Sequence, residues 1–353
     1  MEDKLTFLRV SELNVDEFAE GLSALHLSVS RKKRVPAFWR WCYFTNPVGK
    51  SNLTVAVRGG RVVGKYGLLY MPLIVHGKPV VAGFMENISI EPSERSWQCY
   101  RRLVEMNIFE SQKDNLDFRF GISESSVLNL NERLGVMSLG RPPIYVGILN
   151  VARVLEVRSV PHALSLAGWL VQPIFGLRIK DVRSDNLDIR PVESFDSSFD
   201  ELWSTIAWSR TAAIIKNAAY LNWRYVTPPD RLYRRLAAYR QQRLEGFVIL
   251  RTIGPRRGSA LFELLARDDN PEIMRALLLQ ASRELGTERI GHITALFPAD
   301  SVAAAVLKEI GFKPWGTRLW SKHIVIAPNP PRASYPDLNL KNWDFSLGDW
   351  TGY

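Results

Sequence analysis

The sequence predicts a mixed α/β protein, an α+β arrangement of mixed sheets, built from two similar halves in tandem and ended by an aromatic tail. Its 353 residues exceed two average domains of roughly 150 residues each. Hydrophobic residues make up 46% of the chain and charged residues 23%, which is ordinary globular usage and argues against a disordered, collagen-like or coiled-coil protein. A segment rich in tryptophan and tyrosine in the first half also returns in the second half.

This repeat is the strongest of the three signals. Residues 38–47 resemble residues 220–229, and the matched residues keep a constant separation of 182 positions. The matched pairs are Trp41 and Trp223, Tyr43 and Tyr225, Thr45 and Thr227, Pro47 and Pro229, Arg58 and Arg240, Arg61 and Arg243, and Gly64 and Gly246. A second match joins residues 132–136 to residues 308–312, at a separation of 176 positions. The pattern predicts a duplicated domain.

Hydrophobic periodicity and turn residues predict the same order of elements in each half. The predicted strands of the first half are 5–10, 52–57, 61–71, 80–90 and 118–123, and its predicted helices are 14–27, 96–112 and 126–134. The predicted strands of the second half are 187–192, a hairpin across Gln241 and Gln242, 259–266 and 290–297, and its predicted helices lie within 195–223, 271–285 and 299–310. Gly135 and Gly311 end the last helix of each half.

These elements place one domain at residues 1–154 and another at residues 186–328. Residues 155–185 are expected to form a linker with an apolar helix, because the stretch 160–179 is poor in charge. Pro161 and Pro173 interrupt that stretch, so we expect a packed helix rather than a membrane span, with docking on a membrane surface as the alternative. The tail, residues 329–353, is rich in aromatic residues and is expected to fold back on the domains.

Charge and cysteine content narrow the classes of function. Lys and Arg total 46 against 36 Asp and Glu, and the net charge of +10 favours an anionic partner such as a nucleotide-linked substrate, coenzyme A or nucleic acid. Cys42 and Cys99 have no metal-ligand spacing, and the histidines stand alone, so no metal site is expected. The N-terminus lacks the pattern of a secretory signal, and a cytoplasmic location is expected.

The order strand, helices, hairpin, long strand, helix, strand, helix and Gly-Phe resembles the GNAT acyltransferase fold over residues 1–150 and 185–327. The segment 300–312 is similar to the closing helix of that family and its Gly-Phe ending. The paired aromatic segments and the tail resemble tandem GNAT proteins associated with bacterial surface-polysaccharide synthesis. The resemblance implies an N-acyltransferase that moves an acetyl group from acetyl-CoA to the amine of an amino sugar or nucleotide-linked sugar.

The resemblance also implies where the donor binds. In the family, the strand before the main helix pairs with the pantetheine arm, and a loop R/Q-x-x-G-x-G/A holds the pyrophosphate at a helix N-terminus. The matching donor residues are Ile88, Ile90, Arg95, Ser96 and Gln98. Gln98 and Tyr100 replace the two glycines, which hinders close approach of a phosphate to the backbone. The equivalent turn of the second half is acidic, so the first half is the expected coenzyme A site.

Acyl transfer to an amine needs a base for the ammonium proton and an acid for the thiolate. By resemblance Glu86 is the expected base, against the alternative of a surface or ion-paired glutamate. Glu124, after the next strand, is a second candidate that could instead cap the following helix. The tyrosine that often serves as the acid is absent, since Asn131 and Leu307 stand at its two positions.

The acceptor is expected beside Glu86, and Asn87 is assigned to that pocket. The repeated aromatic residues either line a pocket that stacks sugar or base rings or anchor the core. These residues are Trp41, Tyr43, Trp223 and Tyr225.

Two other functions stay open. The chain is also similar in architecture to Fem-type ligases, which pair two GNAT-like domains and take an aminoacyl group from tRNA, and the net charge of +10 suits that donor. A binding or regulatory protein that has lost the coenzyme A loop is the third reading. The oligomeric state is left open.

Overall fold

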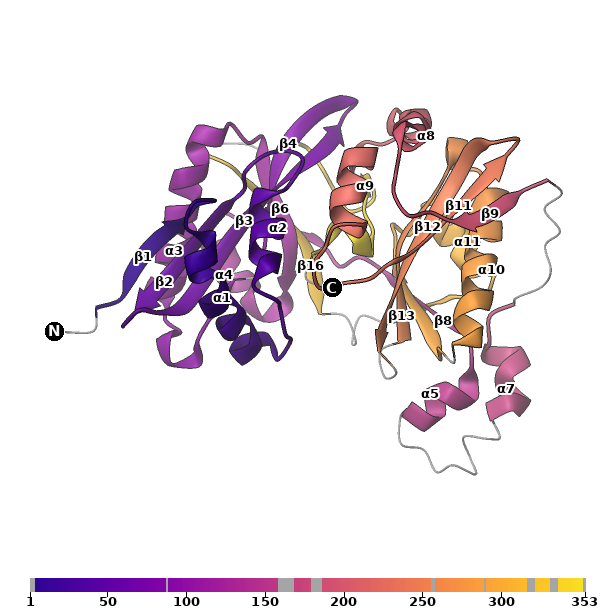
Figure 1. The fold of residues 1–353 in the computed structure, drawn as a ribbon, viewed down its shortest axis with the longest axis horizontal. Coiled ribbons are helices and arrows are strands. Elements are labelled where there is room, and N and C mark those ends of the chain that lie inside the picture. The colour runs from indigo at the N-terminus through magenta and orange to yellow at the C-terminus, as the bar shows by residue number, and fades with distance from the viewer. Residues whose placement is uncertain are drawn as a thin grey trace.

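The protein has two lobes, arranged side by side with the C-terminal tail between them (Figure 1). A computed structural model describes residues 4–86, 88–157, 168–178, 186–254, 258–288, 290–315, 321–330 and 336–351. Each lobe is a twisted mixed sheet covered by helices, so the mixed α/β fold class is confirmed.

The first lobe follows the predicted order of elements closely. Its strands are β1 (Thr6–Val10), β2 (Asn52–Arg58), β3 (Arg61–Val75), β4 (Lys78–Met85), β5 (Ser89–Ile90), β6 (Phe118–Glu124) and β7 (Met137–Gly140). Its helices are α1 (Val15–Ser30), α2 (Ala37–Phe44), α3 (Trp97–Ser111) and α4 (Leu128–Glu132), with 3-10 turns at Pro92–Glu94, Gln112–Asp114 and Ser125–Val127. Helices α1 and α2 cover one face of the sheet, and α3 packs against β2 and β3 on the other.

The second lobe repeats this plan. Its strands are β9 (Asp188–Pro191), β10 (Ala212–Ile214), β11 (Arg234–Arg240), β12 (Arg243–Gly254), β13 (Gly258–Ala266), β14 (His292–Leu296) and β15 (Lys313–Trp315). Its helices are α8 (Ser197–Ala207), α9 (Ala218–Tyr225), α10 (Pro271–Thr287) and α11 (Val302–Glu309), with a 3-10 turn at Arg267–Asp269. The register shifts between Ala56 and Val57 and between Ala238 and Tyr239 fall at equivalent positions of the two hairpins.

Both sheets contain strands from the other half of the chain: β10 pairs with β3 of the first sheet, and two further strands change sheets. β8 (Ile144–Ile148) follows β7 in sequence but pairs with β14 and β15 of the second sheet. β16 (Lys322–Pro328) follows β15 in sequence but pairs with β6 and β7 of the first sheet. Each sheet therefore contains strands from both predicted domains, 1–154 and 186–328. These domain boundaries remain a prediction, because they divide the sequence and not the sheets.

A stacked pair of tryptophans joins the lobes. The rings of Trp41 in α2 and Trp223 in α9 lie 5.1 Å apart and nearly parallel. Each indole N–H donates to the backbone carbonyl of the other tryptophan, at 3.0 Å from Trp41 and 3.2 Å from Trp223. This reciprocal arrangement relates α2 to α9 by a local two-fold axis and makes the repeat the centre of the shared core.

The tail runs back between the lobes. β17 (Trp343–Asp344) pairs with β10, which in turn pairs with the end of β3, and the 3-10 turn η5 (Leu347–Asp349) packs against β13. Five apolar tail residues are buried in the main core: Leu338, Trp343, Phe345, Leu347 and Trp350. The tail is thus an internal element of both lobes.

Three details differ from the sequence expectations. The predicted strand 80–90 is broken after Met85, because a bulge intervenes before β5. The helical region 195–223 contains the short strand β10 between its two helices. The linker holds two described helices, α5 (Val151–Val157) and α7 (Gly168–Phe175), while residues 158–167 and 179–185 lie outside the described chain.

Candidate functional site

The first lobe has a place where two neighbouring parallel strands part. β4 and β6 pair only where Gly83, Phe84 and Met85 face residues 119–121. Beyond Met85 the chain turns into β5, which pairs with β3, while β6 continues to Glu124 against β16. Among the described residues no ladder joins β5 to the end of β6, so both strands present backbone groups toward the gap between them.

A β-bulge places Glu86 at this parting. Leu68 pairs with Met85 and Lys65 pairs with Ser89, so one more residue lies on the β4–β5 side than on β3. The amide of Glu86 donates to the carbonyl of Gly67 at 3.0 Å, which fixes the start of the bulge. Asn87, the other residue assigned to the acceptor pocket, lies outside the described chain.

Glu86 is 8% exposed and interacts electrostatically with Lys65 of β3, Cys42 of α2 and Arg34. Burial lowers the pKa of Lys65, against the opposing attraction of Glu86. Burial, and secondarily Glu86, raises the pKa of Cys42, so this thiol stays protonated at neutral pH. Burial, with the nearby charges of Lys65 and Arg34, lowers the pKa of His26 to about 3. The carboxylate therefore sits in a cation-rich and poorly hydrated environment.

A chain of hydrogen bonds runs from α3 to the free end of β6. The hydroxyl of Tyr100 donates to Oδ1 of Asn131 at 2.6 Å, and Nδ2 of Asn131 donates to the hydroxyl of Ser123 at 2.7 Å. Asn131 occupies the position at which the family resemblance implies a tyrosine acid. Sequence reasoning treated Tyr100 only as an obstacle, yet its phenol is the hydroxyl that contacts this position.

Glu124, the second carboxylate candidate, is held by the exchanged strand. Its carboxylate accepts hydrogen bonds from Lys322 and, at 2.7 Å, from Ser321. Burial opposes ionisation of Glu124, but these two donors outweigh it and lower the pKa of the carboxyl group. An ion-paired carboxylate of this kind is a weaker proton acceptor than a free one. It also does not cap the following helix, because no side-chain cap is found there.

The N-terminus of α3 offers part of what a pyrophosphate needs. The first-turn amides have no acceptor inside the helix, and Arg95 is exposed beside them. Ser96 caps the helix by accepting from the amide of Cys99 at 3.1 Å, and Glu94 is bound by Arg58 at 2.7 Å. The side chain of Gln98 is exposed, whereas that of Tyr100 is buried. Of the two residues that replace the glycines, only Tyr100 therefore takes up space inside the protein next to the N-terminus of α3.

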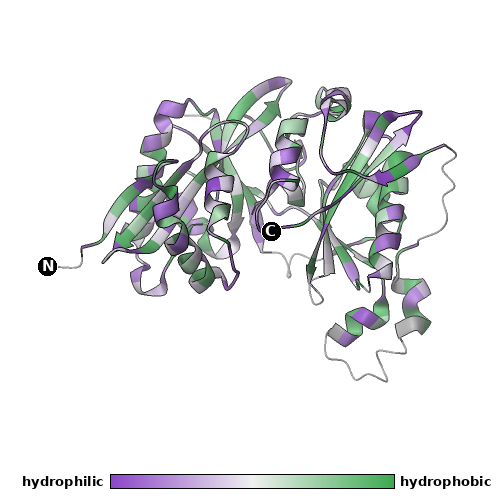
Figure 2. Ribbon diagram, in the orientation of Figure 1, coloured by the Kyte–Doolittle hydropathy of each residue, from purple (hydrophilic) through white to green (hydrophobic). Residues whose placement is uncertain are grey.

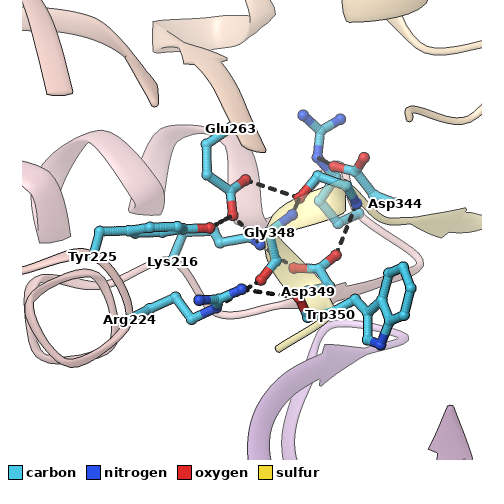
Figure 3. Close-up of polar contacts among 10 residues, drawn as sticks. Lys216, Arg224, Tyr225, Glu263, Asp344, Gly348, Asp349 and Trp350 are labelled. Atoms are coloured by element: carbon cyan, nitrogen blue, oxygen red, sulfur yellow. Dashed lines mark hydrogen bonds and ion pairs between the residues drawn. The ribbon is translucent and has the colours of Figure 1, made fainter. Parts of the chain in front are cut away.

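The corresponding place in the second lobe is filled by the tail. β13 and β14 pair only at Ser259, Ala260 and Leu261, and η5 of the tail packs against the rest of β13. Glu263 of β13 accepts from Lys216 at 2.7 Å, from the hydroxyl of Tyr225 at 2.5 Å and from the hydroxyl of Ser346 at 3.2 Å. Lys216 also binds Asp349 of the tail (Figure 3).

The charges of this buried cluster hold one another in place. Burial opposes the charge of Lys216, but Asp349 and Glu263 outweigh it and raise the pKa of the amine. Burial raises the pKa of Glu263 against the attraction of Lys216. A cavity of about 40 Å³ remains beside the cluster, which is room for a water molecule but not for a pantetheine arm.

Two buried arginines fasten the tail from the second lobe. Arg224 donates to the carbonyl of Gly348 at 2.9 Å and to that of Trp350 at 3.0 Å, as Figure 3 shows. Arg231 donates to the carbonyl of Thr351 at 2.6 Å. Donors fixed by burial and bonded to backbone carbonyls make the tail a permanent part of the lobe.

Arginine side chains from both lobes meet next to this tail. Arg34 of the first lobe and Arg231 of the second both contact Asp230, at 3.1 and 3.2 Å. Burial alone would raise the pKa of Tyr233, but Arg224, Arg231 and Arg251 lower it to about 8. Tyr233 and Arg251 also line a groove of about 540 Å³ at the end of the second sheet. The contact between the lobes is therefore strongly positive.

The repeated aromatic residues belong to the core. Trp41, Tyr43, Trp223 and Tyr225 are all buried, and each tryptophan ring stacks on the other. The interpretation that they stack on a substrate ring finds no support in this packing. Of the acceptor and base candidates that the structure describes, only Glu86 therefore lies at the parting of β4 and β6, with Glu124 at the far end of β6.

Sequence reasoning missed the buried ionic cluster of the second lobe, although a signal was present. Glu263 is the single charged residue of the strand 258–266, and Lys216 lies between the apolar residues 212–215 and the helix α9. A lone charge in an apolar run is buried only when it has a partner, which is the pattern that points to a buried pair.

The part of the chain that the structure describes contains neither a membrane-spanning helix nor a cluster of metal ligands. No helix there is long and apolar enough to cross a bilayer. No three His, Cys, Asp or Glu side chains there come together as a metal site would require.

Comparison with known proteins identifies the fold. No protein-family model matches the sequence, and no curated protein is similar to it in sequence. In structure, the chain is similar to N-myristoyltransferase of Saccharomyces cerevisiae with bound myristoyl-CoA and inhibitors, with a TM-score of 0.65 and 12% identity over 98% of this chain and 84% of that one. It is also similar to a GCN5-related N-acetyltransferase (GNAT) of Anabaena variabilis, with a TM-score of 0.58 and 13% identity over 92% of this chain and 72% of that one.

The fold is that of the GNAT proteins. A third similar structure, from Enterococcus faecalis and described as a probable N-acyltransferase, has a TM-score of 0.59 and 9% identity over 92% of this chain and 73% of that one. All three likenesses span both lobes, so the two-lobed GNAT architecture expected from the sequence is confirmed. At these identities the likeness concerns the fold.

Proposed function

We propose that this protein is an N-acyltransferase that takes its acyl group from a coenzyme A thioester and carries out the transfer in the first lobe. The observation that supports this choice is the contrast between the two partings of parallel strands. In the first lobe, the ladder ends beside the buried carboxylate of Glu86. In the second lobe, Phe262 takes the equivalent bulge position and the tail fills the space.

The donor would lie along the backbone of β5 and the N-terminus of α3. Ile88 and Ile90 border the edge of β5 that no described strand pairs with; the carbonyl of Ile90 accepts from Nε of Arg95 at 3.1 Å, a bond that the pantetheine amides would replace. Arg95, Ser96 and Gln98 surround the helix N-terminus, where amides and a guanidinium can bind the pyrophosphate. The structural likeness to a protein with bound myristoyl-CoA supports a donor of this class. We keep acetyl as the proposed acyl group.

Glu86 would serve as the base. The thioester supplies the carbonyl carbon that the amine attacks, so that a C–N bond forms and the C–S bond breaks. Glu86, directly or through a water, takes the ammonium proton. The departing thiolate takes a proton from the hydroxyl of Tyr100, which contacts Asn131 at the acid position. Lys65 and Arg34 place positive charge beside Glu86.

The proposed acceptor is the amine of an amino sugar or of its nucleotide-linked form, used in polysaccharide synthesis. A nucleotide-linked acceptor carries phosphates, and Arg34, which interacts with Glu86 and shares Asp230 with Arg231, contributes positive charge beside the proposed base. We also propose that the two lobes arose by duplication. The repeated bulges and the reciprocal contacts of Trp41 and Trp223 support that origin.

Glu86→Gln tests the proposal. The purified protein is incubated with acetyl-CoA and a panel of free and nucleotide-linked amino sugars, and release of the free thiol is followed. Loss of a general base lowers turnover by about 10²- to 10⁴-fold near neutral pH, with a smaller deficit at high pH. Glu110→Gln, which removes a carboxylate paired with Arg9 on the surface of the same lobe, is the matched control and should keep full turnover.

The outcome separates the remaining readings. Unchanged turnover in Glu86→Gln would clear Glu86 of the role of base. No transfer from acetyl-CoA, together with salt-dependent binding of aminoacyl-tRNA, would favour the Fem-like function that the net charge of +10 also suits. Neither binding nor transfer of either donor would favour a non-catalytic binding protein.

A further inference from the structure

The linker carries a helix pair that stands apart from both sheets. α5 and α7 pack against each other and project from the end of the second lobe (Figure 1). The amide side chain of Gln172 ties α7 to the base of this pair. Its Oε1 accepts from the amide of Val151 at 2.8 Å, and its Nε2 donates to the carbonyl of Leu149 at 2.9 Å. Gln172 therefore marks the face of α7 that is turned toward the protein.

The opposite face of α7 exposes large apolar side chains. Leu170 and Ile174 are 60% and 72% exposed. They are neighbours on one helix face, because they are four residues apart, and each lies two residues, or about 200°, from Gln172. The other exposed large apolar residues of the described chain are spread singly over different helices, strands and loops: Leu8, Leu13, Leu27, Val35, Phe109, Met137, Trp208 and Leu232. Only α7 concentrates two of them on one projecting face.

The charges around this helix have one predominant sign. Arg178 is the single Lys, Arg, Asp or Glu of residues 160–179, and its side chain is exposed. Residues 151–183 contain five basic and two acidic residues. In Figure 2, hydrophilic and hydrophobic residues are interspersed along the helices and strands of both lobes. A short apolar helix bordered by bases is suited to the boundary between lipid headgroups and acyl chains.

We propose that α7 docks this protein on the surface of a membrane that contains anionic lipid. Leu170 and Ile174 enter the headgroup boundary, and the exposed Arg178, three residues after the end of α7, faces the lipid phosphates. The helix lies on the bilayer, since no described helix is long enough to cross it. A second copy of the chain is a poorer occupant, because two side chains on an eight-residue helix cannot supply the roughly 800 Å² per partner of a stable interface. The inference does not depend on the proposed acyl transfer.

Flotation of the full chain with phosphatidylcholine vesicles, with and without phosphatidylglycerol, tests this inference. We expect binding to the vesicles that contain phosphatidylglycerol, and weaker binding as salt is raised. The double substitution Leu170→Asp with Ile174→Asp should weaken vesicle binding by about tenfold or more. The matched control, Leu13→Asp with Leu232→Asp, changes two side chains that are 95% and 91% exposed on other surfaces and should bind like the wild type.

Circular dichroism and melting temperature confirm that both double variants are folded, and Leu170→Ser with Ile174→Ser repeats the test without added charge. Absence of binding to anionic vesicles would overturn the inference, and so would binding that both α7 variants retain. A dimer in sedimentation that the α7 variants abolish would assign the face to a second copy instead. Acyl transfer to a soluble acceptor is measured in parallel. The α7 variants should keep it, so failure of membrane binding and failure of the proposed reaction remain distinguishable.

Discussion

The two lobes share one fold but differ at the point where two parallel strands separate. In both, a parallel pair of strands separates after three paired residues, and a bulge follows on the strand before the main helix. The first lobe places Glu86 at that bulge, next to ionisable groups from both lobes. The second places Phe262 there, and beyond it Glu263, which is bound to Lys216 and to the tail.

This difference indicates that the parting in the first lobe is a functional site and that the parting in the second lobe is a structural contact between the sheet and the tail. A parting of strands leaves backbone groups that need partners, and either a ligand or another part of the chain can supply them. In the second lobe the tail supplies them permanently, with charges neutralised inside the core. The comparison therefore predicts that disturbing the second parting costs stability, whereas disturbing the first costs activity.

The largest effect is expected when the buried cation of the second lobe is removed. Lys216→Met leaves Glu263 and Asp349 buried without their counter-charge, and we expect a loss of about 3–5 kcal/mol in the free energy of unfolding. One carboxyl group will then hold a proton in the folded state, so its folded pKa is raised above the unfolded value. Stability of the variant should therefore fall further as the pH rises from 5 to 8, which denaturant titrations at several pH values measure.

Lys322→Met is the control from the first lobe. Lys322 binds Glu124, whose side chain is 44% exposed and stays hydrated when the pair is broken. We expect a loss of at most about 1 kcal/mol. Equal losses in the two variants would contradict the contrast between a buried joint and an accessible site.

Most helices and strands of both lobes could be predicted from the sequence, but the exchange of strands between the two sheets could not. Hydrophobic periodicity and glycine turns are local signals, so most strands and helices of the two lobes were found within a few residues, although α2, β7, β8, β10 and β16 were not among those predicted. Which sheet a strand joins depends on contacts far away in sequence, and nothing in the residues of β8 or β16 distinguishes one edge from the other. The bulge after Met85 was also hidden, because an extra residue does not interrupt an apolar run.

Single residues of the site could be predicted from the sequence, but contacts between distant segments could not. Glu86 could be selected because it is an isolated acid in a strand at a characteristic place in the fold. The hydrogen bond between Tyr100 and Asn131 could not, because it joins α3 to α4 across the sheet edge. The aromatic tail could be expected to bury itself, but not to enter the parting of the second lobe, since its destination is set by Arg224, Lys216 and Glu263 together.

A smaller effect is expected from one methyl group in the tail. A Cβ atom on Gly348 would lie 2.1 Å from Oε1 of Glu263 and 2.1 Å from the hydroxyl of Tyr225, both of which are held by other bonds. Gly348→Ala should therefore cost about 1–3 kcal/mol of stability in chemical denaturation. Gly286→Ala is the matched control, because nothing lies within 4 Å of its Cβ position in α10, and it should be neutral or slightly stabilising. A neutral Gly348→Ala would show that the tail packs loosely.

The smallest effect concerns Tyr233, whose equivalent in the first lobe is the non-titrating Ser51. The pKa of Tyr233 is about 8, because Arg224, Arg231 and Arg251 outweigh burial, whereas an unfolded tyrosine titrates near 10. The folded chain thus loses this proton first, the unfolded chain binds more protons between pH 8 and 10, and stability rises with pH across that interval. We expect a gain of about 1 kcal/mol between pH 7 and pH 9. The Tyr233→Phe variant should lack both this gain and the step in tyrosinate absorbance near pH 8. An absorbance step that persists in Tyr233→Phe would mean that the arginines beside the tail do not act on this phenol. The positive charge of these arginines at the contact between the lobes would then have to be balanced by another group.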